Sequence, residues 1–320
     1  EGRRRHRPTR GRVPRMILGF LSLQPLTWPT IATALALGGV YALMAVGIGL
    51  VFGVLRLVNF AYGQLIMAGG YALAYGSIWG FATWESILFC FGVVLLLTVL
   101  MDRLVFRPLR TSSPTVMLVA TFAVAFLLQN IALLKFGPLS KSVGSLAQLN
   151  VPWDIFGVQI KEIAVLAVAT AVGSLVILQL LLTKTPLGLH MRAAAMDFRT
   201  ARLLGVRANR VIGAAVIISG LLAATSAVFL SVQENSISST FGLQDTIIVL
   251  AGVVVGGMNR PIPATLGGFS IGFATGILGG VLPADKTQYL TSFIFAAVIV
   301  VLLVRPNGLF TRGGGTVERV

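Results

Sequence analysis

Long apolar runs alternate with short polar segments along nearly the whole chain. A helix of about 20 apolar residues crosses the hydrocarbon core of a bilayer, and most of these runs approach or exceed that length. The apolar runs are 30–54, 65–81, 86–104, 115–135, 163–183, 211–232, 246–257, 265–282 and 289–304. The run 246–257 is short, and glycine-rich or polar breaks separate others. The pattern predicts an all-α polytopic membrane protein with about eight transmembrane helices, some of them short or broken.

The composition excludes a water-soluble globule. Hydrophobic residues make up 56% of the 320 residues and charged residues only 11%, whereas a soluble domain carries about 25% charged residues. The 36 glycines suit close packing between helices in a membrane. The chain lacks the repeated alternation, about ten residues at a time, that a transmembrane β-barrel requires.

The charged residues predict an orientation in the membrane. Basic residues concentrate in 103–110, 184–210 and 305–319, which the positive-inside rule places in the cytoplasm. The loops that hold most of the acids, and that we therefore expect outside, are 136–161, 233–245 and 283–287. Three apolar runs precede residue 103, so the first run should begin outside.

The N-terminus is an arginine-rich stretch that does not fit this orientation. We interpret residues 1–15 as an extension that is disordered or not native, and residues 16–320 as a single transmembrane domain. The alternative is a basic tail on the membrane surface. A re-entrant second run, or a crossing by 16–27, would also resolve the conflict. The net charge of +15 does not indicate a nucleic-acid partner, because no aromatic residue interleaves with these arginines to stack on bases.

The segment 184–210 is the longest polar interruption between apolar runs, with six basic residues against the single acid Asp197. Spacings of three and four predict an amphipathic helix. Its apolar residues are Met191, Ala194, Ala195, Phe198, Ala201 and Leu204, and the arginines across from them are Arg192, Arg199 and Arg202. Such a helix can lie on anionic lipid or dock into a cytoplasmic partner. We favour the partner.

A second polar interruption, residues 56–64, brings Asn59, Tyr62 and Gln64 beside Gly63 between two apolar runs. Irregular backbone at membrane depth is tolerated only where it is buried in protein or lines a wet cavity. The segment is therefore either a piece of a solute pathway or an ordinary interhelical turn that bends at Gly63.

Several kinds of chemistry lack the residues they need. Cys90, His6 and His190 are too few and too scattered for a metal site or a catalytic triad. The phosphate-binding pattern G-x-x-x-x-G-K-[ST] is absent, so an ATP-driven machine would need its ATPase on another polypeptide. No acid lies deep within an apolar run, which argues against a proton-driven carrier.

Two further patterns concern architecture. Three apolar runs at each end of the chain close on an Arg-Pro pair, Arg107-Pro108 and Arg305-Pro306, an echo of the kind that repeated transporter halves leave in a sequence. The segment V-V-V-G-G-M-N-R-P-I-P-A-T-L-G-G (253–268) is a poor helix and predicts a hairpin.

Six sequence blocks carry a family resemblance. They are R-L-V-N-F-A-Y-G-Q-L-I-M-A-G-G-Y (56–71), R-L-V-F-R-P-L-R (103–110), L-L-Q-N (127–130), G-L-H-M-R-A-A-A-M-D-F-R-T-A-R-L-L-G-V (188–206), V-V-V-G-G-M-N-R-P-I-P-A-T-L-G-G (253–268) and V-R-P-N-G-L-F (304–310). In this order they resemble the membrane permeases of ABC importers for branched-chain amino acids, over about residues 30 to 310.

The resemblance implies a multi-pass importer subunit in the cell (inner) membrane of a bacterium or archaeon. An extracytoplasmic solute-binding protein would deliver the solute, two identical or homologous permeases would form the pathway, and two ATPase subunits would drive alternating access. This chain would not be an enzyme and would hold no cofactor, and ATP would bind the partner. Membrane lipid would surround the helices.

The resemblance also implies roles for particular residues. Segment 188–206 matches the element that the ATPase grips, and the pattern 56–64 matches a hinge beside the translocation path. The expected coupling residues are Arg192, Asp197, Arg199, Ala201, Leu204 and Gly205, where Arg199 comes from the helical pattern alone. The expected pathway residues are Asn59, Phe60 and Gly63 from the resemblance, together with Tyr62 and Gln64 from the polar pattern of the segment alone.

The chain departs from the family pattern at three places, of which the first concerns a coupling contact and the other two leave the solute open. The family usually has an acid at the position of Met196, a histidine at that of Tyr62, and a Gly-Ser-Ile-Pro-Gly-like turn where 259–263 stands. Related permeases carry urea and short amides. The alternative function is a gradient-driven carrier or channel for such a small polar solute. An intramembrane enzyme fares worst, because neither G-x-S-x-G nor H-E-x-x-H occurs.

Overall fold

The computed structural model describes residues 27–55, 58–109, 112–144, 152–155, 158–196, 198–258, 261–305 and 308–310. Its helices are α2 (Trp28–Leu55), α3 (Tyr62–Ile78), α4 (Thr83–Met101), the π-helical η1 (Asp102–Phe106), α5 (Arg107–Leu109), α6 (Pro114–Phe136), α7 (Glu162–Lys184), α8 (Pro186–Met196), α9 (Phe198–Leu203), α10 (Ala208–Glu234), α11 (Leu243–Gly256), α12 (Pro261–Val281), the 3-10 helix η3 (Ala284–Tyr289) and α13 (Leu290–Val304). Four short strands pair antiparallel as β1 (Lys141–Ser142) with β4 (Ser236–Ile237) and β2 (Pro152–Ile155) with β3 (Val158–Lys161).

Seven helices in the described part of the chain are long and apolar enough to cross a membrane. They comprise α2, the continuous α4–η1–α5, α6, α7, α10, α12 and the η3–α13 unit. The shorter helices α3 and α11 pack among them. The chain is therefore an all-α multi-pass membrane protein, and the predicted mixture of long and short helices is confirmed. The predicted hairpin is confirmed in part. Helices α11 and α12 pack against each other, and α11 ends at Gly256 while α12 begins at Pro261, but 253–256 and 261–268 are helical, which the sequence did not predict.

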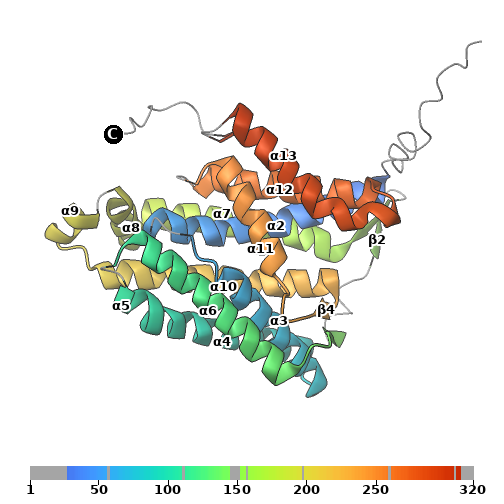
Figure 1. The fold of residues 1–320 in the computed structure, drawn as a ribbon, viewed down its shortest axis with the longest axis horizontal. Helices are drawn as coiled ribbons and strands as arrows, with labels where there is room; N and C mark the ends of the chain where they lie inside the picture. The colour runs from blue at the N-terminus through green and yellow to red at the C-terminus, as the bar shows by residue number, and fades with distance from the viewer. Residues whose placement is uncertain are drawn as a thin grey trace, which may run out of the picture.

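The loops divide between the two ends of the bundle as their charges predict (Figure 1). Helices α5, α8 and α9 gather at one end, on the left of the view, and strands β2 and β4 lie at the other. The β1–β4 pair ties the loop after α6 to the loop after α10. The basic segments thus lie opposite the segments predicted to be outside. We call the α8–α9 end cytoplasmic and the strand end outer.

Helix α2 forms the centre of the bundle. Of its most apolar stretch 78% is buried, against 11% for α13 and 17% for α7, so α2 is enclosed by protein while the peripheral helices present apolar surface for lipid. It contacts β3 at the outer end and α8 at the cytoplasmic end. The first span therefore begins at the strand end, the end that the charges of the loops predict to be outside. The stretch 1–26, which includes the arginine-rich extension, lies outside the described residues.

A stripe of glycines on α12 explains its close contact with α2. Gly268, Gly272, Gly276 and Gly280 recur every fourth residue, and a Cβ on any of them would collide with α2. Their neighbours on α2 run in the opposite order, from Ala45 back to Thr30. Small residues at this spacing let two membrane helices approach along their whole length.

Local signals start and stop the helices. Ser113 Oγ accepts a hydrogen bond from the Val116 amide and Pro114 follows at the first helical position, which begins α6. Helix α10 ends at Asn235, whose left-handed conformation (φ 54°) closes the last turn.

Candidate functional site

The predicted hinge is a compact turn between α2 and α3. The Asn59 side-chain oxygen accepts from the Ala61 amide at 3.1 Å, and the Tyr62 amide donates to the Asn59 carbonyl at 3.3 Å. Asn59 is 6% exposed and Ala61 is fully buried. Asparagine favours such a turn because its short side chain can bond the backbone two residues on. The first turn of α3 therefore begins within the protein.

The first turns of α3 and α11 meet inside the bundle. A Cβ on Gly63 would lie 2.9 Å from both the Gly242 carbonyl oxygen and Thr246 Oγ1. Gly242, the N-cap of α11, adopts a left-handed conformation (φ 73°) that favours glycine. Gly63 thus permits close contact between two short helices. Gly63 lies inside α3 and is not among the positive-φ residues, so the turn before α3 does not require glycine at this position.

A cavity of about 310 Å³, the inner cavity, lies where the hinge meets α2, α3, α6 and α11. Its lining is mostly aliphatic and aromatic. The described lining residues are Ile48, Val58, Asn59, Phe60, Gln64, Phe122, Ala125, Phe126, Gln129, Leu243, Thr246, Ile247 and Leu250. Phe60 and Phe122 meet edge to face with ring centroids 5.7 Å apart, which joins the hinge to α6.

Gln64 is the unusual member of this lining. Its side chain is fully buried, yet neither Nε2 nor Oε1 hydrogen-bonds any group in the described part of the chain. By contrast, Asn59 bonds the Ala61 amide, and Thr246 Oγ1 donates to the Gly242 carbonyl at 2.6 Å. Leaving a buried polar group unpaired costs about 1–3 kcal/mol. Because this unpaired side-chain amide lies beside a cavity, it points to a hydrogen-bond partner on another molecule that enters the cavity.

The structure divides the five expected pathway residues. Asn59, Phe60 and Gln64 line the inner cavity. Tyr62 does not, because its fully buried ring packs against Gly47 of α2, and Gly63 faces α11. Sequence reasoning missed Phe122 and Phe126 of α6 and the α11 residues. Apolar side chains in an apolar helix carry no local signal that they line a cavity.

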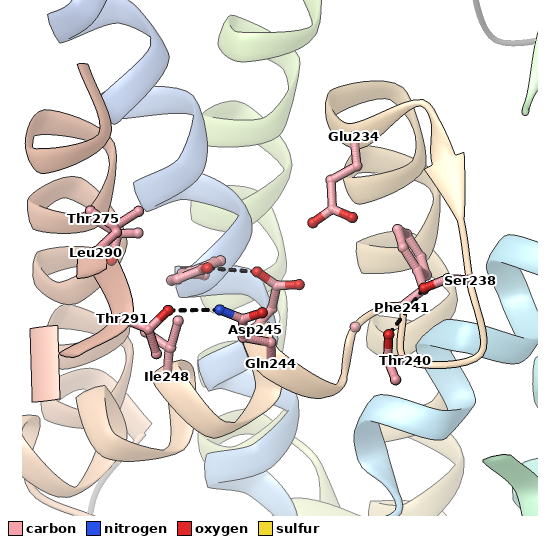
Figure 2. Close-up of a pocket in the computed structure, with 12 residues that line it drawn as sticks. Glu234, Ser238, Thr240, Phe241, Gln244, Asp245, Ile248, Thr275, Leu290 and Thr291 are labelled. Carbon is pink, nitrogen blue, oxygen red and sulfur yellow. Dashed lines mark hydrogen bonds between the residues drawn. The ribbon is translucent and has the colours of Figure 1, made fainter. Parts of the chain in front are cut away.

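A second, polar cavity of about 250 Å³, the outer pocket, lies toward the strand end of the bundle (Figure 2). It is lined by residues from α2, α10, α11, α12, α13 and the loop before α11. They are Tyr41, Glu234, Ser238, Thr240, Phe241, Gly242, Gln244, Asp245, Ile248, Thr275, Leu290 and Thr291. Two carboxyl groups, Glu234 and Asp245, share this space, which favours a positively charged group over an anion.

Hydrogen bonds hold α11 on this side. The Tyr41 hydroxyl donates to Asp245 Oδ1 at 2.6 Å, and Gln244 Nε2 donates to Thr291 Oγ1 at 2.7 Å (Figure 2). The sequence places Asp245 in an outer loop, which is wrong: it lies in the first turn of α11. A carboxylate near a helix N-terminus is favoured by the unpaired amides there.

The two cavities therefore flank the same short helix. Gly242, Asp245 and Ile248 face the outer pocket, while Thr246 and Leu250 face the inner cavity. Helix α11 is the wall between a polar space toward the outer end and an apolar space beside the hinge. A solute that passed from one to the other would have to pass α11.

At the opposite end, the segment 184–210 forms two short helices rather than the single one expected. The Thr185 hydroxyl donates to the Leu181 carbonyl at 2.6 Å and accepts from the Gly188 amide at 3.1 Å. With Pro186 at the first helical position, Thr185 caps α8 as soon as α7 ends. Figure 1 shows α9 projecting beyond the ends of the long helices, with α8 beside it at the same end of the bundle.

The amphipathic pattern is confirmed along α8 and fails after α9. Met191, Ala194 and Ala201 are at most 4% exposed, and Arg192 is exposed. Leu204, expected on the buried face, is 80% exposed because the helix ends at Leu203 and a turn carries the chain away. The neighbouring Leu203 is 85% exposed.

The other expected coupling residues have mixed outcomes. Gly205 is exposed and adopts φ 87°, a left-handed conformation that lets the chain turn toward α10. Arg199 belongs to α9, but its side chain is not described. Asp197 lies outside the described residues.

A membrane helix bundle with cavities on either side of a short internal helix, and a helical segment projecting at one end, suits a transport protein of the membrane. Comparison with known proteins then gives the family. Residues 30–303 match the family of branched-chain amino acid transport system permease components. This match covers most of the chain, and the chain belongs to that family.

Curated relatives agree along nearly their whole lengths. The chain is 28% identical over 294 residues to the high-affinity branched-chain amino acid transport system permease protein BraD of Pseudomonas aeruginosa, covering 88% of this chain and 95% of that protein. It is 29% identical over 291 residues to the corresponding protein LivH of Escherichia coli (strain K12), covering 86% and 92%. The chain is accordingly a multi-pass protein of the cell inner membrane.

A solved structure supports the fold. The chain resembles a structure described as the inward-facing conformation of a metal-chelate type ABC transporter, with a TM-score of 0.51 and 20% sequence identity. The likeness covers 90% of this chain and 94% of the other. At this identity the likeness concerns the arrangement of helices alone.

Proposed function

We propose that this chain is a membrane-spanning subunit of an ATP-driven importer for branched-chain amino acids. It forms half of the translocation pathway beside a second permease, identical or homologous, and it couples to separate ATPase subunits through the segment 184–210. The observation that carries the proposal is the projecting α8–α9 segment in a chain of this family. The chain is a transport subunit and not an enzyme, and ATP binds the partner.

The surface of the projecting segment supports docking of a cytoplasmic protein. Leu203 and Leu204 expose most of their side chains at its tip, next to the exposed Gly205. Leucines beyond the ends of the long helices are not covered by the hydrocarbon of the membrane. A groove on a partner protein would bury them. Arg192, exposed on α8, adds a charge at the same end. The buried residues Met191 and Ala201 anchor the segment to the bundle.

The two cavities support a role in translocation. The inner cavity, with Asn59, Phe60 and Gln64 from the predicted hinge, is bounded by α6, whose Phe122 and Phe126 are about half exposed at 49% and 52%. That exposed face is where we place the second permease, so that the pathway runs between the two subunits. An extracytoplasmic solute-binding protein would deliver solute at the outer end, and membrane lipid would cover α7 and α13.

The test is reconstitution in liposomes with radiolabelled leucine. We expect ATP-dependent uptake when the chain is combined with its second permease, the ATPase subunits and the solute-binding protein. We expect no ATP hydrolysis and no uptake by the chain alone. Gradient-driven leucine uptake by the lone chain would instead identify a carrier or channel.

A variant at the tip tests the coupling surface directly. Leu204→Ala should weaken capture of the ATPase by about tenfold, as loss of a buried interface anchor does. Leu166→Ala is the matched control, because Leu166 is 48% exposed on α7, the helix that we expect lipid to cover, near the end of the bundle opposite the docking surface. Equal ATPase affinity for the two variants would contradict the proposed docking surface.

A further inference from the structure

We infer that the inner cavity binds a small solute without net charge, and that Gln64 is the residue that recognises the solute's polar groups. This inference rests on the proposed function and specifies it. It concerns selection by the permease itself, after any solute-binding protein has released its cargo.

The chemistry of the lining sets the charge of the ligand. None of the described residues around the inner cavity carries a charge, and most are aliphatic or aromatic. An ion brought into such a space would lose its hydration without meeting a counter-charge. In a zwitterionic amino acid the ammonium and carboxylate groups lie next to each other and partly offset one another's charge, and the hydrocarbon part of an aliphatic one matches these walls. A volume of about 310 Å³ suits a small molecule.

The carboxamide of Gln64 supplies what a zwitterion needs. A glutamine side chain presents two N–H donors and one carbonyl acceptor, so Nε2 can donate to a carboxylate while Oε1 accepts from an ammonium group. Both atoms are fully buried and have no hydrogen-bond partner among the described residues. By contrast, the side-chain oxygens of Asn59 and Thr246 already form hydrogen bonds with nearby backbone groups. Among the described lining residues Gln64 is the fully buried one whose carboxamide has no hydrogen-bond partner, whereas Gln129, the other lining glutamine, is only partly buried.

The position of Gln64 would let binding act on the helices around it. Gln64 sits one residue after Gly63, at the point where the first turn of α3 touches α11. Phe60, two residues before Tyr62, joins the hinge to Phe122 of α6. A solute bound to Gln64 would therefore contact the hinge, α6 and α11 together.

The test measures binding to the purified nucleotide-free complex of both permeases and the ATPases, without the solute-binding protein. The probes are L-leucine, L-lysine and L-glutamate, and the readouts are radiolabelled leucine binding and thermal unfolding. Wild type should bind leucine and be stabilised by it, because a ligand that binds only the folded state raises the melting temperature. Lysine and glutamate at the same concentration as leucine should leave the melting temperature unchanged.

Gln64→Leu separates a binding role from a structural one. It should weaken leucine binding about tenfold or more, while the ligand-free complex unfolds at the same or a higher temperature, because an unpaired buried amide has been removed. Ser219→Ala is the control. Ser219 is buried and its hydroxyl donates to the Gly47 carbonyl at 3.0 Å, so its loss should lower the melting temperature and leave leucine binding intact.

Gln64→Glu keeps the shape of the side chain and tests the charge rule if the leucine variant fails to fold. It should weaken leucine binding and allow lysine to bind. Unchanged leucine affinity in both Gln64 variants, or a wild type that transports leucine but shows no binding without the solute-binding protein, would overturn the inference and leave the proposed function standing. Failure of the wild-type complex to transport leucine would count against the proposed function itself.

Discussion

The Tyr41 hydroxyl and the Asp245 carboxylate lie 2.6 Å apart although 204 residues separate them in the chain. Tyr41 belongs to α2, the central helix, and Asp245 to the first turn of α11. The bond holds the short helix that separates the two cavities against the most buried helix of the bundle. The position of α11 thus depends on a contact between the two halves of the sequence.

Tyr41→Phe should destabilise the protein by about 1–3 kcal/mol, because the carboxyl group of Asp245 loses its donor in a partly enclosed pocket. Thermal unfolding of the purified complex in detergent measures the change. The control is Tyr71→Phe, because the Tyr71 hydroxyl is buried with no hydrogen-bond partner among the described residues, and its ring stacks on Phe136 at 4.3 Å. Equal stability of the two variants would show that the Tyr41–Asp245 bond contributes little.

Gly63→Ala should push α3 and α11 apart. The added methyl would lie 2.9 Å from the Gly242 carbonyl and Thr246 Oγ1, and overpacking of this kind costs about 1–3 kcal/mol. Both stability and leucine uptake should fall. Gly92→Ala on α4, where a Cβ meets nothing within 4 Å, should be neutral or stabilise the helix by up to about 1 kcal/mol. A harmless Gly63→Ala would mean that the two helices have room to separate.

Arg192→Glu should uncouple transport. The side chain is exposed on α8, so reversing its charge leaves the fold intact but opposes an acidic site on the ATPase. We expect leucine uptake to fall about tenfold or more while the melting temperature stays unchanged, since reversing a contact between charges costs several kcal/mol. Lys135→Glu, exposed at the outer end of α6, is the control. Uptake equal to wild type would remove Arg192 from the coupling surface.

Cysteine labelling tests the orientation. The native Cys90 is fully buried, so it should stay unlabelled by a membrane-impermeant thiol reagent. Leu203→Cys and Leu139→Cys replace leucines that are 85% and 76% exposed at opposite ends of the bundle. In intact cells the reagent should label position 139 and spare position 203, and inverted membrane vesicles should reverse the result. Labelling of position 203 from outside would place α8 and α9 on the wrong side of the membrane for an ATPase.

The sequence by itself determined the class of the protein. In a bilayer every backbone amide and carbonyl must be paired within the structure, so long apolar runs can only become helices. The charge of the loops then orders them between the two ends. The basic charge of the segment 184–210 predicted its place at the cytoplasmic end, and the spacing of its apolar residues predicted the buried face along α8.

Only the tertiary structure decided which polar side chains meet a cavity. Tyr62 and Gln64 are two residues apart on one helix and look equally suitable in the sequence, but neighbours at that spacing point to different sides of a helix. Tyr62 meets α2 and is enclosed, while Gln64 meets the space left between α6 and α11. The contact of Asp245 with Tyr41, and the exposure of Leu204, likewise depend on where distant helices pack and where a short helix stops. Such contacts depend on the packed positions of segments far apart in the chain, which no local pattern records.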